Sequence, residues 1–546
     1  MTKLPLSAFT TAIHGIPPEV ARQWLCLFAV FVVMYLAALD QTIVITVMAK
    51  IQQRFHTKTG IGWIISGYML PVAVLTLVWG RLAYLFGTKS VICIAVVVFE
   101  IGSLVSALSI SMNMLIVGRV IAGIGGGGIQ TVVYLILNDI STLQNRGMFL
   151  NVVNIAYAVS SVSGPLLGGA FGNSSRLTWR WCFYVNLPIG AFALICLLLS
   201  YRPISATKKI PSILNMARSV DLIGLILLSC GLTFLLLGLS FVCNYRGDSF
   251  AVAGCFVLGG VFTVLFLVYD LFLYNPTGDQ QPLLALQLLR LTPVYTAALT
   301  MFFGEMVFII TCIAVANDLQ YVLDLSAWKT GVYLLPMVMS VVVFSTMTAI
   351  LMSKTRYVKP FALTGALFSC LGAGLLVHAI AASSKPKLLG LQVFVGIGFG
   401  LIIQPGMTSP QIPVKEGHPQ LLNMVTTFLA FCRALGAAMG AAFETIIFTA
   451  TVLKDVKIAK LTGISEDLND LLAAVSSDSS SFSEDGKRVI KSSIADGYRL
   501  VMVIAAVFGG VEVISSIFMD GHRVPLDAES ESQTRLEISV EESEAS

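Results

Sequence analysis

Long apolar runs separated by short polar segments dominate the chain. Each run has about 20 residues or more, which is enough for a helix to cross the hydrocarbon core of a bilayer. We count about fourteen such runs and predict a helix for each, because a spanning segment must satisfy its own backbone hydrogen bonds. They cover residues 24–49, 61–83, 90–110, 114–137, 149–171, 181–200, 220–243, 250–274, 294–316, 329–352, 360–382, 388–408, 420–450 and 499–519. The pattern therefore predicts an all-α membrane protein.

Polar segments and one overlong run depart from this pattern. The segment 451–498 is rich in Ser, Asp and Lys, so we expect it to lie outside the membrane, with helical stretches at 467–475 and 486–495. The run 420–450 is longer than one crossing needs, so its end is expected to be tilted or interfacial. The tail 520–546 is acidic and poor in apolar residues, which predicts disorder.

Composition supports the membrane assignment and excludes several other classes. The chain has 546 residues, of which 56% are hydrophobic and 12% charged, with a mean hydropathy of +0.86. The net charge of +4 is small and scattered, so nothing indicates nucleic-acid binding. The first apolar run begins at Trp24 without a cleavage site after it, which predicts a retained span and not a signal peptide.

Cofactor sites are not indicated either. The ten cysteines lie mostly inside apolar runs without a ligand-like spacing, which favours packing roles over a disulfide framework or a zinc site. The glycine run Gly123–Gly128 is not followed by the Lys-Ser/Thr pair of a phosphate loop, so it predicts no nucleotide site. We expect no metal and no cofactor.

One run carries a polar stripe. Within Leu115–Thr131, a helix would place Arg119, Gly123, Gly126 and Gln130 on one face, with Ile, Leu and Val on the others. A cation among apolar spans must face a partner or a water-filled cavity, so Arg119 is expected to point inward. Glycines allow close approach of a neighbouring helix. We interpret this face as one wall of a transport cavity.

Charged residues inside other runs are further candidates. Asp40 lies well within the first run, beside Gln41 and Thr42, where an ionised carboxylate costs at least about 2.5 kcal/mol. It is predicted to bind a proton or a cation, and the alternative is a structural hydrogen bond to a neighbouring helix. For Arg119 the alternatives are an electrostatic role beside a carboxylate and a packed interface. Glu305 either faces the cavity or lies nearer the membrane surface.

Weaker signals have structural interpretations. Asp221 is expected to cap the helix that follows it, with Gly224 one turn on. The three tryptophans near run ends are expected to form an interfacial belt: Trp63, Trp179 and Trp181. Three further acidic residues inside apolar runs are weaker candidates than Asp40: Glu100, Glu444 and Glu512.

Several motifs occur in a fixed order on the early spans. A tight basic loop, Gly80–Lys89, joins runs 2 and 3, and Gly164–Gly169 places a proline kink beside glycines in run 5. Trp179–Gly190 leads into run 6, and Arg433–Gly440 lies in the second half. Together with Asp40 and Arg119, these motifs resemble the major facilitator superfamily, specifically its fourteen-span drug:proton antiporters. The resemblance extends to the fungal branch that holds multidrug exporters and vacuolar basic amino-acid transporters.

This resemblance implies a major facilitator fold, with two six-helix halves and two extra spans, about fourteen transmembrane helices in all. The implied parts are a cytosolic segment 1–23, a first half 24–200, a cytosolic linker 201–219, the extra spans 220–274, a second half 275–519 that includes the polar loop 451–498, and the tail 520–546.

The resemblance also assigns residues. It implies a gating loop of Gly80, Arg81, Gly87 and Lys89, and an antiporter motif of Ser160, Gly164, Pro165, Gly168 and Gly169. Proton coupling and the substrate cavity are assigned to Asp40, Arg119, Gln41, Thr42, Glu305 and Gln130. The sequence departs from the family pattern in four places: Tyr84 stands where the family has an acidic residue, Thr88 where it has arginine, and Asn151 and Ser160 where it has glycine. Ser160 is small enough to serve in place of glycine.

The function implied is secondary transport without covalent chemistry. The expected activity is proton-coupled antiport of small cationic or amphipathic molecules out of the cytosol, as in multidrug efflux. One alternative is import of Lys, Arg or His into the vacuole, and another is a nutrient sensor of the same fold that transports nothing. The partners expected are a small-molecule substrate, protons and the lipid bilayer, with no nucleic acid, for a monomer in the plasma or vacuolar membrane. Asn173 heads a possible glycosylation sequon.

Overall fold

The structure is a computed structural model in which almost every described residue is helical. It describes residues 18–55, 61–173, 178–202, 221–244, 250–270, 291–325, 327–417, 421–458, 484–521 and 523–524. No strand occurs within these ranges.

The helices form a first group, an inserted pair and a second group. The first group is α2 (Pro18–Phe55), α3 (Ile61–Phe86), α4 (Thr88–Ala107), α5 (Met112–Ile140), α6 (Arg146–Asn173), α7 (Trp181–Tyr184) and α8 (Asn186–Ser200). The inserted pair is α10 (Leu222–Asn244) and α11 (Phe250–Val268). The second group is α12 (Thr292–Asn317), the π-helical turn η3 (Asp318–Val322), α13 (Ala327–Thr355), α14 (Lys359–Ala381), α15 (Lys385–Thr408), α16 (Gln411–Gly417), α17 (Leu422–Ile458) and α19 (Glu484–Ile517).

The number of membrane-crossing helices agrees with the hydrophobic pattern. Within the described residues, 13 helical spans are long and apolar enough to cross a membrane, with α7 and α8 forming one of them. The remaining predicted run, 220–243, corresponds to α10, whose apolar part Ile223–Leu239 is shorter. The chain is therefore a multi-pass, all-α membrane protein, as predicted.

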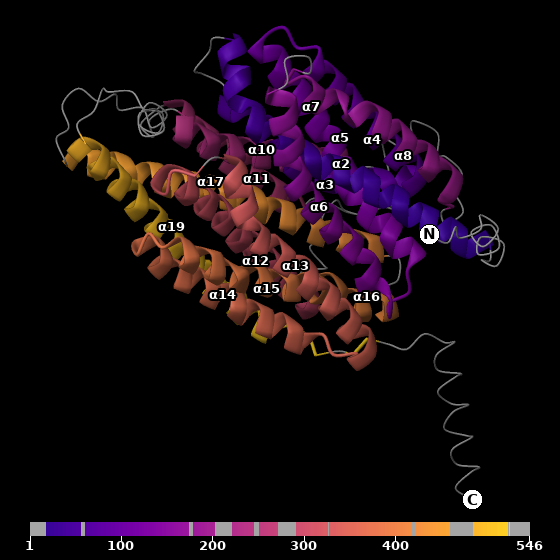
Figure 1. Cartoon of the computed structure of the whole chain (residues 1–546). Coiled ribbons are helices and arrows are strands. Elements are labelled where there is room, and N and C mark those ends of the chain that lie inside the picture. The colour runs from indigo at the N-terminus through magenta and orange to yellow at the C-terminus, as the bar shows by residue number, and fades with distance from the viewer. Residues whose placement is uncertain are drawn as a thin grey trace, which may run out of the picture.

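The two groups are two halves that pack side by side (Figure 1). They meet where α6 packs on α13 and where α3 and α5 pack on α17. The inserted helices pack on each other, and α10 also contacts α3 and α17. The start of α2 and the end of α19 lie at the same end of the bundle, which we name the termini end (Figure 1). The other end is named the opposite end.

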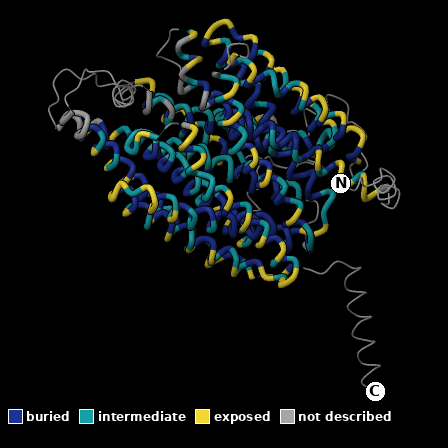
Figure 2. The backbone as a smooth tube through the Cα atoms, in the orientation of Figure 1, coloured by how far each residue is buried: buried dark blue, intermediate teal, exposed yellow. Residues whose placement is uncertain are grey.

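The burial of each residue depends on whether it faces another helix or the outside of the bundle. Buried residues line the contacts between helices and exposed residues face outward (Figure 2). The outward residues include large apolar side chains, such as Phe192, Ile195 and Leu199 on α8. Apolar side chains on the outer surface are expected where lipid, and not water, surrounds a helix.

The last helix begins before the predicted run 499–519. Helix α19 starts at Glu484 and continues to Ile517, and its part that is long and apolar enough to cross a membrane covers Ile490–Ile517. Ile490, Ile494 and Tyr498 are buried at a spacing of four residues and form one apolar stripe. Polar residues between them lower the average hydropathy, which hid the stripe. The helical prediction for 486–495 is confirmed, and 467–475 lies outside the described residues.

Trp179 does not belong to an interfacial belt. Its side chain is buried and makes edge contacts with the rings of Phe55 and Phe183, so the predicted surface position is wrong for this residue. Trp181 is half-exposed. Asp221 was predicted to be a cap, and this is confirmed, because its Oδ1 accepts a hydrogen bond from the Gly224 amide at 2.8 Å.

Candidate functional site

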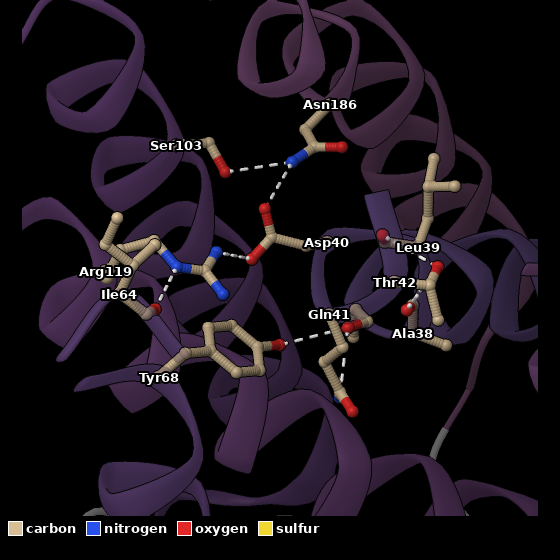
Figure 3. A network of polar contacts seen from close by, with 11 residues as sticks. Ala38, Leu39, Asp40, Gln41, Thr42, Ile64, Tyr68, Ser103, Arg119 and Asn186 are labelled. Carbon is tan, nitrogen blue, oxygen red and sulfur yellow. Dashed lines mark hydrogen bonds and ion pairs between the residues drawn. The ribbon is translucent and has the colours of Figure 1, made fainter. Parts of the chain in front are cut away.

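Asp40 and Arg119 form an ion pair inside the first half. Arg119 Nη1 of α5 donates to Asp40 Oδ2 of α2 (Figure 3). The two side chains are 0% and 1% exposed, so this pair is sealed from water in the present conformation. Buried charges of opposite sign offset each other's desolvation only when their remaining polar atoms are also hydrogen-bonded. The stability of this pair therefore depends on the hydrogen bonds that each partner makes with its surroundings.

The second carboxylate oxygen of Asp40 has its own donor. Asn186 Nδ2, at the start of α8, donates to Asp40 Oδ1 at 3.4 Å and also to Ser103 Oγ of α4 at 3.1 Å (Figure 3). Asn186 is completely buried. The carboxylate is thus held by side chains from α5 and α8, and α8 is tied to α4 at the same point.

Arg119 is held by three further groups. Its Nε donates to the carbonyl of Ile64 in α3 at 3.0 Å. The guanidinium carbon lies 4.5 Å from the ring centre of Tyr68 and 5.9 Å from that of Phe183, which adds cation–π attraction. Tyr68 in turn donates to the Ala37 carbonyl at 3.1 Å. Arg119 therefore keeps partners even when Asp40 is neutral.

A second carboxylate lies close to this pair. Glu100 is on α4, one turn before Ser103, and it is an electrostatic neighbour of Asp40. Its two carboxylate oxygens are buried and have no hydrogen-bond partner within the described part of the chain. Oε1 lies against Gly190 of α8, where a side chain would collide with it. Glu100 is thus an unsatisfied acid in the neighbourhood of the ion pair.

The other predicted residues of the first span face two different directions. Thr42 donates to the Ser160 carbonyl of α6 at 3.1 Å, and Gly164 packs directly on Thr42. These three residues contribute to the contact between α2 and α6. Gln41 lies instead beside the hydroxyls of Tyr68 and Tyr157 and donates to its own helix.

Glu305 forms a second ion pair in the second half. Arg433 Nε of α17 donates to Glu305 Oε2 of α12 at 2.8 Å. Arg433 Nη1 donates to the hydroxyl of Tyr134 in α5 at 2.5 Å, so the arginine bridges both halves. Glu305 lies halfway along α12 and has a charged partner, which favours the cavity-facing alternative. Gln130, another predicted residue, lies one turn before Tyr134 on the same helix.

The two halves repeat each other in detail. Gly123 of α5 approaches the backbone of Tyr68 in α3, and Gly396 of α15 approaches the backbone of Met337 in α13 in the same way. Four residues on, Gly127 and Gly400 repeat these contacts against Val72 and Val341. A side chain at any of these four glycines would collide with the neighbouring backbone or tighten the contact. This equivalence relates α3 and α5 to α13 and α15.

The same correspondence relates Arg119 to a neutral residue. Gln392 of α15 lies four residues before Gly396, as Arg119 lies four before Gly123. Gln392 Nε2 donates to the Tyr333 carbonyl of α13 at 2.6 Å, which copies the bond from Arg119 to Ile64. The second half therefore keeps the hydrogen bond but not the charge.

The contact of α2 with α6 is repeated by α12 with α17. Gly164 packs on Thr42, and Gly440 packs on Met306. By this alignment Asp40 corresponds to Gly304, Gln41 to Glu305 and Tyr157 to Arg433. The neutral neighbours Gln41 and Tyr157 in the first half thus become the ionic pair Glu305 and Arg433 in the second. Arg433 was not singled out as a site residue from sequence, although its motif was noted.

The basic loop between α3 and α4 has two kinds of contact. Gly87 has a φ of 83°, a conformation that favours glycine, and it allows the tight turn. Lys89 Nζ donates to the carbonyls of Leu198 and Tyr201 at 2.7 and 2.9 Å, so it caps the end of α8. Arg81 is buried, with its guanidinium 5.1 Å from the ring centre of Tyr84.

Polar contacts join the halves at the termini end. Asn138 Nδ2 of α5 donates to Thr426 Oγ1 of α17 at 2.7 Å. Arg146 Nη1 of α6 donates to Gln411 Oε1 of α16 at 2.5 Å. All four side chains are buried. Gly80 of α3 also lies against Thr427 of α17 so closely that no side chain fits there. The halves are thus closed on each other at the termini end.

The departure at Asn151 adds to this closure. Asn151 Nδ2 of α6 donates to Thr346 Oγ1 of α13 at 2.6 Å, and Asn151 Oδ1 accepts from Ser345 Oγ at 2.6 Å. A glycine here could make neither bond. Toward the opposite end of the same interface, Pro165 of α6 lies beside Gly331 of α13.

The remaining residues of the antiporter motif and the sequon lie on α6 or just beyond its end. Gly168 is buried on α6, whereas a side chain at Gly169 would meet nothing within 4 Å. Asn173 is the last residue of α6, and the sequon serine Ser175 lies outside the described residues.

Comparison with known proteins gives consistent matches. A family profile described as "Major Facilitator Superfamily" matches residues 30–441. Azole resistance protein 1 of Saccharomyces cerevisiae is 33% identical over 80% of this chain and 78% of its own. Vacuolar basic amino acid transporter 5 of the same yeast is also 33% identical, over 80% of this chain and 81% of its own.

Solved structures share the fold at low sequence identity. The human organic anion transporter MFSD10 (TETRAN) has a TM-score of 0.59 and 14% identity, covering 92% of this chain and 100% of that one. The proton:xylose symporter XylE has a TM-score of 0.56 and 13% identity, covering 93% and 98%.

Proposed function

Because this chain belongs to the major facilitator superfamily of membrane transporters, we propose that it is a proton-coupled antiporter that moves small cationic or amphipathic molecules out of the cytosol. The observation that carries the proposal is the sealed ion pair of Asp40 and Arg119. Buried ionisable residues in membrane spans are expensive and are typical of ion or proton pathways. Asp40 is the proton carrier in this proposal, and Arg119 is its electrostatic partner.

Proton binding changes the contact between α2 and α5. When Asp40 is ionised, its attraction to Arg119 ties the two helices together. A proton on the carboxylate removes that attraction, while Arg119 keeps the Ile64 carbonyl and the Tyr68 ring. Helix α2 is then free to shift relative to α5, and Gln41 moves with it. A proton can shift a conformational equilibrium only if its binding free energy differs between the two conformations, and the loss of this ion pair provides such a difference.

Alternating access needs two arrangements of the halves. In this structure the halves are closed at the termini end, through Asn138, Arg146 and Asn151. In the proposal the termini end faces the cytosol, so this arrangement is the one that has closed behind the substrate. Rocking of one half against the other then breaks these contacts and opens the termini end.

A second candidate function is transport of basic amino acids into the vacuole. It is favoured by the relative named as a vacuolar basic amino acid transporter, which is as similar to this chain as the one named for azole resistance. Both functions use the same proton chemistry. They differ in the substrate and in the membrane that holds the protein.

Uptake into liposomes with an acidic interior tests the proposal. The purified chain is reconstituted, and accumulation of labelled arginine and of a fluorescent organic cation is followed with and without a protonophore. We expect at least one of the two to accumulate, and the protonophore to abolish the accumulation. Binding of either compound without any gradient-driven uptake would instead support a sensor of the same fold and overturn the proposal.

A further inference from the structure

We propose that Glu305 and Arg433 together form the substrate site, and that this site takes a zwitterion, a ligand with both an ammonium group and a carboxylate, in preference to a simple organic cation. The inference rests on the proposed function, because it names the substrate class of the same transporter. It is argued from the exposure, partners and symmetry of the two residues.

Exposure distinguishes the Glu305–Arg433 ion pair from the Asp40–Arg119 ion pair. The side chains of Glu305 and Arg433 are each 12% exposed, whereas those of Asp40 and Arg119 are 0% and 1% exposed. The second pair therefore borders accessible space in this conformation while the first is sealed. The sealed pair suits a proton, which needs no space, and the accessible pair suits a molecule.

The position of Arg433 links ligand binding to the arrangement of the halves. Its guanidinium holds Glu305 within the second half and the hydroxyl of Tyr134 in the first half. A carboxylate that binds the guanidinium competes with both bonds. Ligand binding thus replaces a contact between the halves with a contact to the ligand. A transported substrate must change the contacts between the halves in this way in order to promote their movement.

The symmetry of the fold shows that the charges are concentrated on one wall. The first-half counterparts of Glu305 and Arg433 are Gln41 and Tyr157, which are neutral. Tyr157 is also an electrostatic neighbour of Arg433, so the two walls face each other. A zwitterion can place both charges on the second half. Its neutral part then lies toward Gln41 and Tyr157, which offer hydrogen bonds.

Charge matching favours a zwitterion over a cation. A lone cation beside Glu305 also feels the positive charge of Arg433, and binding it breaks the ion pair without supplying a new partner for the arginine. A buried charge left without a partner is strongly unfavourable. A zwitterion supplies both missing partners: its ammonium group pairs with Glu305, and its carboxylate pairs with Arg433. The faces of Tyr134 and Phe399, which flank the guanidinium at about 6 Å, suit an aliphatic chain.

The test compares arginine with agmatine, its decarboxylated analogue, which keeps the cationic side chain and the amine but lacks the carboxylate. Exchange of each labelled compound across liposomes is measured as counterflow, which needs binding and alternating access but no pH gradient. A lipophilic organic cation, tetraphenylphosphonium, is included, and because it permeates bilayers unaided its exchange is counted only above that of protein-free liposomes. The variants are Arg433→Gln, Arg433→Lys and Glu305→Gln. Lys491→Gln is the control, since it removes a partly exposed cation that pairs with Asp324 far from this site.

We expect arginine to exchange at least about tenfold faster than agmatine in the unmodified protein, because a site built to hydrogen-bond a group rejects an analogue without it. Arg433→Gln should bring the two rates together, Arg433→Lys should keep part of the preference, and Glu305→Gln should weaken both substrates. Lys491→Gln should leave the ratio unchanged. Equal exchange of arginine and agmatine, or exchange of tetraphenylphosphonium alone, would overturn the zwitterion site but not the transporter. No exchange of any compound would contradict the proposed function itself.

Discussion

Arg119 of α5 and Gln392 of α15 occupy equivalent positions in the two halves. Each donates a hydrogen bond to a backbone carbonyl of the neighbouring helix, Arg119 to Ile64 at 3.0 Å and Gln392 to Tyr333 at 2.6 Å. The second half thus shows that this helix contact does not require a charge. The charge of Arg119 is therefore best explained by Asp40, whose counterpart is Gly304.

The equivalence predicts the outcome of a double-mutant cycle. Asp40→Asn leaves Arg119 buried without a counterion, and breaking such a pair lowers stability by roughly 3–5 kcal/mol. Adding Arg119→Gln, which copies the glutamine found at position 392, removes the orphaned charge and should restore most of that loss. Thermal unfolding of the purified single and double variants measures this change in stability. A double variant less stable than Asp40→Asn would contradict the assigned equivalence.

Asn151 should stabilise the arrangement seen here. Asn151→Gly removes two hydrogen bonds to α13, worth about 1 kcal/mol each, so the ratio of the form opened at the termini end to the closed form should rise roughly thirtyfold. Ala349 is buried against Gly147 at this interface, and a cysteine placed there should react with a thiol reagent only after opening.

Labelling of Ala349→Cys should accordingly become faster in the Asn151→Gly background. A cysteine at Lys354, which is exposed near the end of the same helix, is the matched control and should react at the same rate in both backgrounds. Equal labelling of Ala349→Cys with and without Asn151 would show that these hydrogen bonds do not bias the arrangement.

Close contact between Gly80 and Thr427 should be required for turnover. A methyl group at Gly80 would overlap the Thr427 side chain, so Gly80→Ala should prevent closure at the termini end and slow transport. Gly80→Ala combined with Thr427→Gly restores the space, and transport should recover in part, because glycine within a helix costs about 1 kcal/mol. Counterflow rates of the unmodified chain, of Gly80→Ala and of the double variant provide the measurement. Failure of the double variant to recover, while it still folds, would argue against steric closure.

Asp270, beyond the end of α11, should make stability depend on pH. Burial and the nearby charge of Asp221 raise the pKa of Asp270 to about 6. The folded state therefore holds this proton more tightly than the unfolded state, so the contribution of Asp270 to stability falls as pH rises from about 4 to about 6. Asp270→Asn should raise the unfolding temperature at about pH 7 and change it little at about pH 4. An equal change at both pH values would contradict this assignment.

Much of the fold could be predicted from hydrophobicity alone. Spans are long apolar runs, and those signals do not depend on tertiary contacts. The start of α19 could not, because the stripe of Ile490, Ile494 and Tyr498 is averaged with polar neighbours. Trp179 was misplaced for a related reason, since proximity to a span end does not reveal burial against Phe55 and Phe183.

The sequence identified most of the charged residues of the candidate site but not which of them form ion pairs. Asp40, Arg119 and Glu305 are conspicuous as charges inside apolar runs, and the structure brings the first two together. Arg433 was missed as the partner of Glu305 because the two are far apart in sequence. A sequence signal for the internal repeat does exist: Gly-Ile-Gly recurs at residues 123–125 and 396–398, and aligning the halves on it pairs Arg119 with Gln392.

The central claim is that Asp40 carries the proton that drives transport. The most direct measurement compares the unmodified chain with Asp40→Asn in the same liposomes, in two assays: accumulation driven by a pH gradient, and counterflow without one. The account predicts that Asp40→Asn loses the gradient-driven accumulation and keeps counterflow, because binding and alternating access survive without coupling. Undiminished gradient-driven accumulation by Asp40→Asn would contradict it.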